Sequence, residues 1–353
     1  MTRIERLAAL LDEPLLVAGP PFVLGGQANV RYLTGLQSSN AALLVEPDGN
    51  ATLFADFRYA KRARDVEGVS FVETARALLP AIGEHLAGRR IGFEEAHVPY
   101  AGYRALVDAG VDAFPVGALV ESLRAVKDDA EIEIMRRAGA LSDRIFEALA
   151  QERFSGRTER DLVWWVERTF RDAGAEGVSF PTIVAAGETG TSPHADPGES
   201  AIAEGVLVTV DAGCVVDGYC SDCTRTFAVG DVSERLEEIY ALCLAAQLAG
   251  LAAVGPGVHG RDADAAARSV IDAQGLGGAF GHGLGHGVGI QIHEGPVLRP
   301  ESTDVLEAGN VVSVEPGIYL PGEGGVRIED LVLVTEDSSE RLTRFTKELL
   351  TVA

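Results

Sequence analysis

Two hairpins predicted from the sequence each bring a pair of acidic side chains together, and they restrict the possible folds more than any other feature. In the first, the apolar strand Val206–Val210 leads into Asp211, and the chain turns back at Asp217 and Gly218. An Asp-Gly pair suits a two-residue hairpin turn because both of its positions require a positive φ. With this turn, Asp222 lies on the same face as Asp211, with the two Cβ atoms within about 8 Å of each other.

The turn also fixes which residues face each other across this hairpin. Val216 pairs with Tyr219, and the same register places Asp211 opposite Thr224. The two strands are therefore expected to form one antiparallel pair with its carboxylates on a single face.

A second hairpin near the C-terminus repeats this arrangement with two glutamates. The segments Val311–Glu315 and Val326–Leu333 read as strands on either side of a glycine-rich turn. A three-residue loop centred on Gly322 places Glu315 directly opposite Glu329, again on one face.

The surroundings of these four carboxylates argue against an ordinary solvated strand face, which is the commoner place for a single acidic residue. Val210, Val314 and Ile328 beside them are apolar, and both hairpins show the same pattern. Carboxylates gathered on a buried face repel one another unless cations lie between them. The two hairpins therefore predict one shared acidic centre.

The stretch FGHGLGHGVGIQIHEGP, residues 280–296, combines histidines with many glycines. A phosphate-binding loop is one interpretation, but the lysine of the G-x-x-x-x-G-K-[ST] motif and the context of a dinucleotide-binding motif are absent. We expect instead that a histidine from this stretch joins the acidic centre. We expect its glycines to let the backbone approach a substrate peptide closely.

Four carboxylates and an imidazole form an oxygen-rich, moderately hard set of metal ligands. Such a set suits manganese, cobalt(II), iron(II) or zinc better than a thiolate site would. It can also hold two metal ions about 3.5–4 Å apart, the arrangement used in two-metal hydrolysis. Cys220 and Cys223 form a C-x-x-C pair, but no second pair completes a zinc site, so we expect the thiols to pack in the interior.

Length and charge limit the other possibilities. A chain of 353 residues exceeds the usual size of one domain, so we expect two. The formal net charge of -23 repels nucleic acid and anionic membranes, so neither is an expected partner. No apolar run reaches membrane-spanning length, and Ile239–Val254 reads as a buried helix. The N-terminal segment lacks a secretory pattern, and we place the protein in the cytoplasm.

The first part of the chain has the pattern of a small α/β domain. Short apolar runs such as Ala41–Val45 alternate with helical segments such as Ala75–Ala87 and Tyr100–Ala109. We place the end of this domain at residue 122.

The second part opens with a long amphipathic helix over Asp128–Ala150, which has acidic residues in its first turn. Helices near 157–173 and 233–254 follow, interleaved with the hairpins. The expected architecture is α/β, or α+β: an N-terminal domain over 1–122 and a catalytic domain over 123–353.

The order of these phrases resembles one known family. The chain is similar to the pita-bread metallopeptidases, which include aminopeptidase P, prolidase and creatinase. The matching phrases are, in order, Pro193-His194, Asp211, Asp222, His282-Gly283-Leu284-Gly285-His286, His293-Glu294, Glu315-Pro316-Gly317 and Arg327-Ile328-Glu329-Asp330. Two phrases before residue 60, at 29–35 and 56–59, resemble the family's smaller domain. The resemblance covers nearly the whole chain and implies a pita-bread catalytic domain preceded by a creatinase-type α/β domain.

The resemblance also implies a role for each matching position. Five residues correspond to the family's metal ligands: Asp211, Asp222, His286, Glu315 and Glu329. His286 is preferred to His282 because the family places its ligand seven residues before the His-Glu pair. Four further residues correspond to catalytic or pocket positions: His194 and His293, which hold the substrate, His282, which lines the pocket, and Arg327, which lies beside the ligands.

The implied activity is hydrolysis of proline-containing peptides. Two divalent metal ions, with manganese or cobalt expected before zinc or iron, activate a water against the carbonyl that precedes proline. Glu315 is the expected proton acceptor. Members of the family are often dimers, so a homodimer is expected here.

Within this family we expect an Xaa-Pro aminopeptidase, with an Xaa-Pro dipeptidase (prolidase) as the alternative. Some prolidases place an arginine directly after the His-Glu-x-Pro phrase, but that position is Val297 here, and Arg299 follows two residues later. Creatinase-like enzymes and non-enzymatic binding modules share the fold, but the complete ligand set argues against both. Lyases that use a metal pair on this fold stay open, because the ligands alone do not distinguish them.

Overall fold

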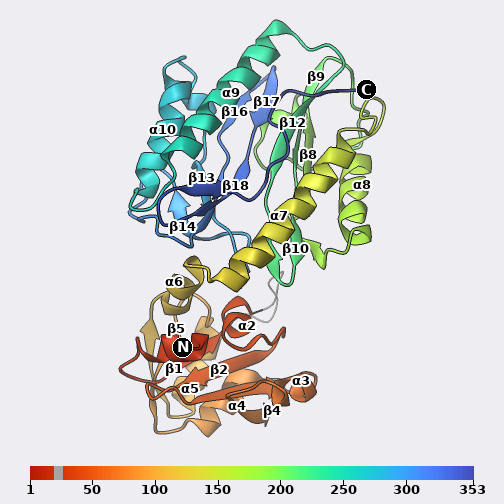
Figure 1. Ribbon diagram of the computed structural model, residues 1–353. Coiled ribbons are helices and arrows are strands. Elements are labelled where there is room, and N and C mark those ends of the chain that lie inside the picture. The colour runs from red at the N-terminus through yellow and green to blue at the C-terminus, as the bar shows by residue number, and fades with distance from the viewer. Residues whose placement is uncertain (20–26) are drawn as a thin grey trace. The chain divides into compact units, whose positions relative to one another are not determined.

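The computed structural model describes residues 1–19 and 27–353 and divides the chain into two compact units, Met1–Arg124 and Ala125–Ala353 (Figure 1). The division falls just after residue 122, where the sequence predicts the domain boundary. Each unit has its own sheets and its own apolar interior.

The N-terminal unit is built on one six-stranded sheet with the order β4-β3-β2-β1-β5-β6. The β1–β2 and β2–β3 pairs are antiparallel, whereas the other neighbours run parallel. The strands are β1 (Leu15–Ala18), β2 (Ala41–Val45), β3 (Ala51–Asp56), β4 (Ser70–Thr74), β5 (Arg90–Glu94) and β6 (Asp112–Val116). The helices are α1 (Arg3–Ala8), α2 (Ala28–Thr34), α3 (Ala60–Arg64), α4 (Leu78–His85), α5 (Tyr100–Asp108) and α6 (Leu119–Ala125).

This unit has the predicted α/β character. The buried run Ala41–Val45 forms β2 over the predicted residues. The helix predicted at Ala75–Ala87 is shorter and spans Leu78–His85. The sequence analysis did not single out β5 and β6, because both are short and mix charged with apolar residues, and β6 also contains Pro115.

The C-terminal unit places its strands between two pairs of helices, α7 with α8 and α9 with α10 (Figure 1). The helices are α7 (Asp129–Leu149), α8 (Glu159–Asp172), α9 (Glu234–Ala253) and α10 (Gly260–Asp272), with 3-10 turns at Thr189–Thr191 and Gly277–Ala279. The strands are β7 (Gly177–Val178), β8 (Ile183–Ala186), β9 (Val206–Asp211), β10 (Cys214–Val216), β11 (Tyr219–Cys220), β12 (Thr224–Val229), β13 (Gly285–Gly287), β14 (Glu294–Leu298), β15 (Val311–Val314), β16 (Gly317–Leu320), β17 (Gly324–Arg327), β18 (Asp330–Val334), β19 (Ser339–Arg341) and β20 (Thr351–Val352).

Local sequence explains where these helices begin. α7 starts with a capping box, in which the Asp128 side chain accepts from the Glu131 N–H and the Glu131 side chain accepts from the Asp128 N–H. The helix then follows the predicted range closely. α10 was not predicted, because its buried face consists largely of small residues such as Ala263 and Ala267, and no large apolar side chain appears before Val270.

The first hairpin has the predicted turn and register. Val216 pairs with Tyr219. Asp217 and Gly218 form the turn with φ values of 46° and 83°, as a type I′ turn requires. Among the described residues, Asp217 is the only one other than glycine with a positive φ, a conformation that this turn type imposes on it.

The pairing of this hairpin is interrupted where its acidic residues lie. Asp211 faces Thr224 as predicted, within the β9–β12 pair. The β10–β11 pair beyond it belongs to a different sheet, and Asp222 lies in the gap between β11 and β12. The sequence predicted one continuous pair, whereas the structure has two short ones that part at the carboxylates.

The second hairpin is divided in the same way. Val314 faces Asp330 and Gly317 faces Arg327, which is the predicted register. Glu315 and Glu329 are not strand residues: they lie where the β15–β18 pairing ends and the β16–β17 pairing begins. In a continuous strand, side chains alternate strictly between the two faces. A break in each hairpin allows carboxylates from both hairpins to turn toward one centre.

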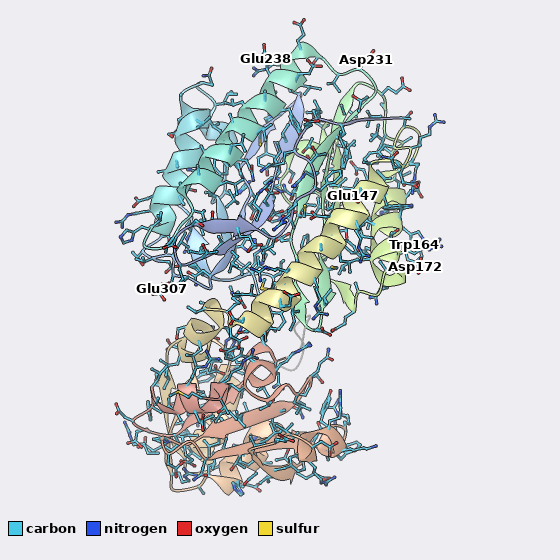
Figure 2. All side chains as sticks on the ribbon, viewed as in Figure 1. Glu147, Trp164, Asp172, Asp231, Glu238 and Glu307 are labelled. Atoms are coloured by element: carbon cyan, nitrogen blue, oxygen red, sulfur yellow. The ribbon has the colours of Figure 1, made fainter. Side chains whose placement is uncertain are left out.

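Each helix pair of the C-terminal unit has its own apolar interior. Phe146 of α7 and Phe170 of α8 pack with Phe227 of β12, whereas α9 and α10 pack against β15 to β18. Of the two tryptophans on α8, Trp165 packs against the first interior, whereas Trp164 is 68% exposed and points outward (Figure 2).

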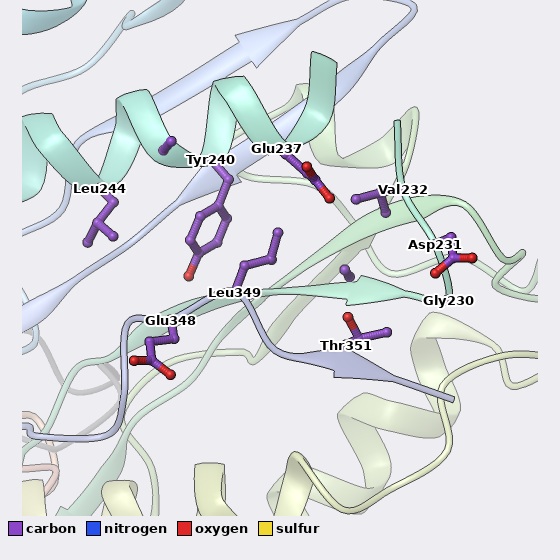
Figure 3. A pocket seen from close by; sticks show the side chains of 11 residues that line it. Gly230, Asp231, Val232, Glu237, Tyr240, Leu244, Glu348, Leu349 and Thr351 are labelled. Atoms are coloured by element: carbon purple, nitrogen blue, oxygen red, sulfur yellow. The ribbon is translucent and has the colours of Figure 1, made fainter. Parts of the chain in front are cut away.

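Helix α9 has the length and composition of a membrane span, as do many core helices of soluble proteins. Its inner face carries Gln247, which is fully buried and donates to Asp330 Oδ2 at 3.2 Å. The N-terminal half of α9 forms a groove with the C-terminal segment, with a volume of about 660 Å³ (Figure 3). Tyr240 and Leu349 line this groove between acidic side chains such as Glu348.

A buried ion-pair cluster holds β12 to β18. Asp330 accepts from Arg225 Nη2 at 2.8 Å and from Lys347 Nζ at 2.7 Å, and both Asp330 and Arg225 are buried.

Asp330→Asn removes the charge opposite a buried guanidinium, so we expect the free energy of unfolding to fall by about 3–5 kcal/mol. Asp217→Asn, in the exposed pair with Arg137, is the control and should cost less than about 1 kcal/mol. Equal losses in denaturant unfolding would contradict the prediction.

Candidate metal centre and substrate pocket

The five side chains predicted as metal ligands gather at one point of the C-terminal unit. Asp211, Asp222 and Glu329 each place one carboxylate oxygen within 4.8 Å of the others. His286 Nε2 lies 3.7 Å from Asp222 Oδ2 and 3.2 Å from Glu315 Oε1. The breaks in the two hairpins supply Asp222, Glu315 and Glu329. The last residue of β9 is Asp211, and β13 supplies His286.

Two hydroxyl groups hold the glutamates in place. Thr224 Oγ1 donates to Glu329 Oε2 at 2.8 Å, and Ser313 Oγ donates to Glu315 Oε1 at 3.0 Å. Ser313 Oγ also accepts from the His286 backbone N–H at 3.0 Å, so it ties two neighbouring ligand positions together. Neither hydroxyl was predicted to take part in the site, although the hairpin register places Thr224 opposite Asp211.

Two oxygens of the centre have no donor. Asp211 Oδ1 and Glu329 Oε1 are buried and accept no hydrogen bond from any described residue, and Glu329 is 1% exposed. Burial raises the pKa of Asp222 well above its ordinary value, and the nearby Asp211 charge adds to the rise. Burial, followed by repulsion from Asp222, does the same to the pKa of Glu329. Divalent cations at this point would satisfy both orphan oxygens and replace the protons that these carboxyl groups otherwise retain.

One ligand pair is also an ion pair. Burial alone would lower the pKa of His286, but the hydrogen bond and charge of Glu315 raise it to about 9. The same contact lowers the pKa of Glu315 to about 2 against the effect of burial. The imidazole and the carboxylate thus stabilise each other's charged form, and metal binding would have to replace this pairing.

A chain of hydrogen bonds links the remaining predicted residues to the centre. Arg327 Nη2 donates to Asp211 Oδ2 at 2.6 Å, and Arg327 Nη1 donates to Tyr319 Oη at 3.0 Å. Tyr319 Oη in turn lies 2.9 Å from His282 Nε2. His282 therefore points to Tyr319 rather than to the carboxylates, unlike His286. Tyr319 was missed in the sequence, although it lies only two residues after the Glu315-Pro316-Gly317 phrase.

These groups lie at a pocket of about 530 Å³. His194 and His293 line its wall, and the His293 ring lies 4.3 Å from the His286 ring, measured between centroids. Asp196 and Arg299 also line the pocket. Neither side chain forms a hydrogen bond or ion pair with another residue in the part of the chain that the structure describes.

The glycines of the 280–296 stretch have a different use from the one expected. A Cβ on Gly285 would lie 2.0 Å from the Ser313 carbonyl oxygen, and one on Gly287 would lie 2.1 Å from the Gly295 carbonyl oxygen. These glycines therefore allow β13 to fit tightly between β15 and β14, with His286 between them. Gly285 also lines the pocket, but the space next to its Cα is taken by the protein's own backbone, not by a substrate.

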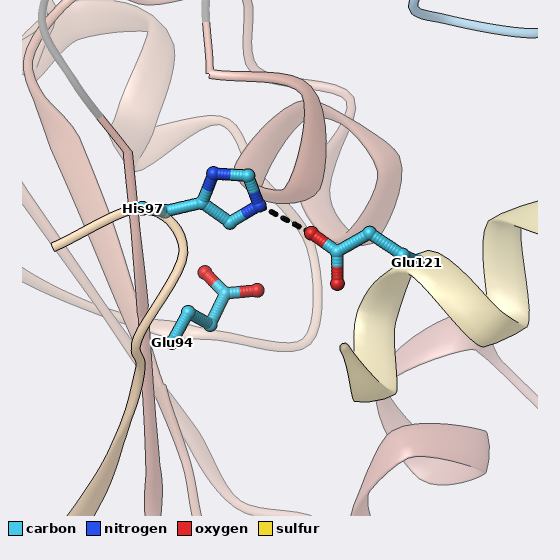
Figure 4. Close-up of side chains that lie close together, drawn as sticks. All are labelled: Glu94, His97 and Glu121. Carbon is cyan, nitrogen blue, oxygen red and sulfur yellow. Dashed lines mark hydrogen bonds and ion pairs between the residues drawn. The ribbon is translucent and has the colours of Figure 1, made fainter. Parts of the chain in front are cut away.

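A second group of possible ligands lies in the N-terminal unit: Glu94, His97 and Glu121 (Figure 4). Glu94 already accepts from Asn29 Nδ2 at 2.5 Å and from the Ala18 N–H at 3.1 Å, and His97 is hydrogen-bonded to Glu121. Burial raises the pKa of Glu94 to about 7, and the Glu121 charge adds to the rise. Donors within the protein thus satisfy Glu94, and we interpret the group as a polar network that fixes α6 to the end of β5.

Comparison with known proteins places the chain in one family. Residues 133–336 match metallopeptidase family M24, and residues 3–126 match the creatinase/prolidase N-terminal domain. The chain is 39% identical over 355 residues to the uncharacterized peptidase YqhT of Bacillus subtilis (strain 168), with 99% of each chain covered. The protein therefore belongs to metallopeptidase family M24, whose enzymes use divalent metal ions.

Two solved structures share the whole architecture. An Xaa-Pro dipeptidase from Bacillus anthracis matches with a TM-score of 0.93 and 37% identity, covering 99% of both chains. An X-Pro aminopeptidase from Thermotoga maritima MSB8 matches with a TM-score of 0.87 and 31% identity, covering 98% of this chain and 100% of that chain. The predicted fold, a pita-bread catalytic domain with a creatinase-type N-terminal domain, is confirmed.

The close fit around His286 gives a direct test. Gly287→Ala forces a Cβ against the Gly295 carbonyl oxygen, which as a backbone atom moves little, so we expect a loss of about 1–3 kcal/mol in the free energy of unfolding. Gly281→Ala is the matched control, because a Cβ there has no atom within 4 Å. If both variants unfold at the same denaturant concentration, the close packing of β13 against its neighbours does not depend on Gly287.

Proposed function

We propose that this protein is a two-metal hydrolase that cleaves Xaa-Pro dipeptides between the first residue and proline. The observation that carries the proposal is the buried group of four carboxylates and one histidine beside the pocket, in which Asp211 and Glu329 each have an oxygen without a donor. The likeness to the Bacillus anthracis Xaa-Pro dipeptidase supports the substrate class.

The residues present fit a metal pair. Two ions would be held by Asp211, Asp222, His286, Glu315 and Glu329. A set of four carboxylates and one imidazole favours manganese or cobalt, with zinc or iron as alternatives. When bound, such ions polarise a carbonyl group and lower the pKa of a water molecule far enough for it to act near neutral pH.

The other side chains supply proton transfer and substrate binding. Glu315, held by Ser313 beside the pocket, is our candidate to accept a proton and pass it to the leaving nitrogen. That nitrogen must gain a proton as the C–N bond breaks, because it would otherwise leave as an unstable amide anion. Burial, together with the charge of His286, lowers the pKa of His293. His293 is therefore uncharged at neutral pH and still has one N–H to donate to the carbonyl oxygen as negative charge develops there.

His194 is the second group for this task. It lines the same pocket and is exposed to solvent. From there it can hold the substrate from another part of the wall than His293. Arg327 supports the centre by fixing the Asp211 carboxylate rather than by touching substrate.

We now prefer a dipeptidase to an aminopeptidase, which is the opposite of the preference drawn from the sequence. The dipeptidase structure matches more closely than the Thermotoga maritima aminopeptidase, with TM-scores of 0.93 and 0.87. Within the pocket, Arg299 has no acidic partner among the described residues, so it is available to bind the free carboxylate of a dipeptide. Val297 lines the same pocket and offers no charge. Aminopeptidase activity is the second candidate, because that aminopeptidase shares the fold over the whole chain.

The role of Arg299 can be tested with substrates that differ in one group. Arg299→Met should lower kcat/KM for an Xaa-Pro dipeptide by about 10- to 100-fold, the value of a hydrogen bond to a charged group. Hydrolysis of the corresponding Xaa-Pro amide should not change, because the amide has no carboxylate. Steady-state kinetics of the manganese-loaded protein measure both. Arg261→Met removes an exposed arginine at the start of α10 outside the pocket and serves as the control.

Two results would revise this proposal. If the wild type prefers an Xaa-Pro-Xaa tripeptide and Arg299→Met has no effect, the enzyme is an aminopeptidase. If the protein binds two metal ions and cleaves none of these substrates, its proline specificity is refuted, and other C–N or C–S substrates must be tried.

A further inference from the structure

A buried glutamate that is not a predicted ligand holds the loop that carries His194. Glu159 is the first residue of α8 and is 4% exposed. It forms no ion pair with any residue in the described ranges. Its carboxylate instead accepts from three donors: the Ala186 N–H at 2.7 Å, the Gly198 N–H at 2.6 Å and the Thr189 hydroxyl.

The two backbone donors mark the two ends of one loop. Ala186 is the last residue of β8, and Gly198 follows residues 187–197, which include His194. Glu159 Oε1 accepts from the first end and Oε2 from the other. One carboxylate therefore closes the loop, as compact surface loops require their ends to be held close together.

Few other contacts fix the part of the loop that lines the pocket. Arg327 Nη1 donates to the Pro193 carbonyl oxygen at 3.3 Å, and Arg160 Nε donates to the Pro197 carbonyl oxygen at 3.1 Å. Outside the pocket lining, Glu188 Oε2 accepts from the Gly322 N–H at 3.2 Å. The His194 side chain forms no hydrogen bond with any described residue. Its position therefore depends on the backbone of the loop, and the backbone depends on its closed ends.

The chemistry of this position calls for a carboxylate and not an amide. All three groups that face Glu159 are donors, and an ionised carboxylate has two oxygens that accept. A glutamine side chain would turn its NH2 group toward the N–H of either Gly198 or Ala186. The hydrogen bond that holds that end of the loop would then be lost. A negative charge is also favourable at this place, because Glu159 lies in the first turn of α8, where the helix dipole is positive.

We infer that Glu159 is a positioning residue for catalysis, which sets the 187–197 loop so that His194 meets the substrate. The inference rests on the proposed function, since it assigns Glu159 a part in the same reaction. Glu159 acts through His194, does not touch substrate and binds no metal.

The test is a double-mutant cycle in the manganese-loaded protein. Glu159→Gln should lower kcat/KM for an Xaa-Pro dipeptide by about 10- to 100-fold, because a displacement of about 1 Å in a catalytic group costs that much. Its metal content should equal that of the wild type. In a protein that already carries His194→Ala, the same change should cost less than about twofold, because the group that Glu159 positions is gone.

The matched control is Glu199→Gln, which removes the exposed ion pair with Arg160 next to the same loop. This variant should stay within about twofold of the wild type. If Glu159→Gln costs the same factor with and without His194, Glu159 has a general structural role and the inference is refuted. Thr189→Val removes the hydroxyl that donates to Glu159 but leaves the Ala186 and Gly198 N–H groups bound to it. This variant should give a smaller loss of kcat/KM, and it provides a second test if Glu159→Gln does not fold.

Amide hydrogen exchange separates this inference from the proposed function. Exchange at residues 186–198 should be faster in Glu159→Gln than in the wild type, and unchanged exchange would refute the closure of the loop. If the wild type cleaves no Xaa-Pro substrate, the proposed function fails. Faster exchange would then still establish the closure, and the absence of a cleaved Xaa-Pro substrate would refute the catalytic role of Glu159 in this reaction.

Discussion

Repulsion among four buried carboxylates is the constraint on which the rest of the catalytic unit depends. Asp211, Asp222, Glu315 and Glu329 gather where water is largely excluded. Burial and the neighbouring like charges raise the pKa values of Asp211, Asp222 and Glu329, whereas contact with His286 lowers that of Glu315. Two cationic side chains of the protein reduce this repulsion: Arg327 pairs with Asp211, and His286 pairs with Glu315. Asp222 and Glu329 have no such partner within hydrogen-bonding distance among the described residues. An arrangement of this kind is costly for stability alone. It becomes reasonable when divalent cations complete it, as in the metallopeptidase family to which the chain belongs.

The backbone is arranged to bring these charges together. Each of the two hairpins keeps one register from end to end but divides into two short pairs at its acidic residues. The glycines around His286 then let β13 pass so close to its neighbours that no Cβ would fit at Gly285 or Gly287. The pocket wall is fixed in the same manner, because the loop that carries His194, for which we propose a role in substrate binding, is held at both ends by Glu159. The candidate metal site and the pocket wall thus both depend on contacts of the main chain, which a few side chains stabilise.

The sequence predicted those parts of the structure that depend on local chemistry. The Asp217-Gly218 turn fixes its own register, and Asp128 with Glu131 marks the start of α7, so both could be located from a few residues. The breaks in the hairpins could not, because they follow from contacts between segments more than a hundred residues apart. Thr224 and Glu159 were missed for the same reason, because each acts through a partner that is distant in sequence: Glu329 for Thr224, and the loop from Ala186 to Gly198 for Glu159. The preference for an aminopeptidase came from one position, Val297, whereas the pocket as a whole places Arg299 where a free carboxylate can be bound.

The central claim is that the acidic centre holds two metal ions, and metal stoichiometry tests it most directly. The metal-free protein would be loaded with manganese, and its metal content would be measured together with its electron paramagnetic resonance spectrum. Our account predicts two manganese ions per chain with a spin-coupled signal, and loss of that coupling in Glu329→Gln, which replaces one oxygen that has no donor by an amide. A single uncoupled ion per chain, or a coupled pair that survives Glu329→Gln, would contradict it.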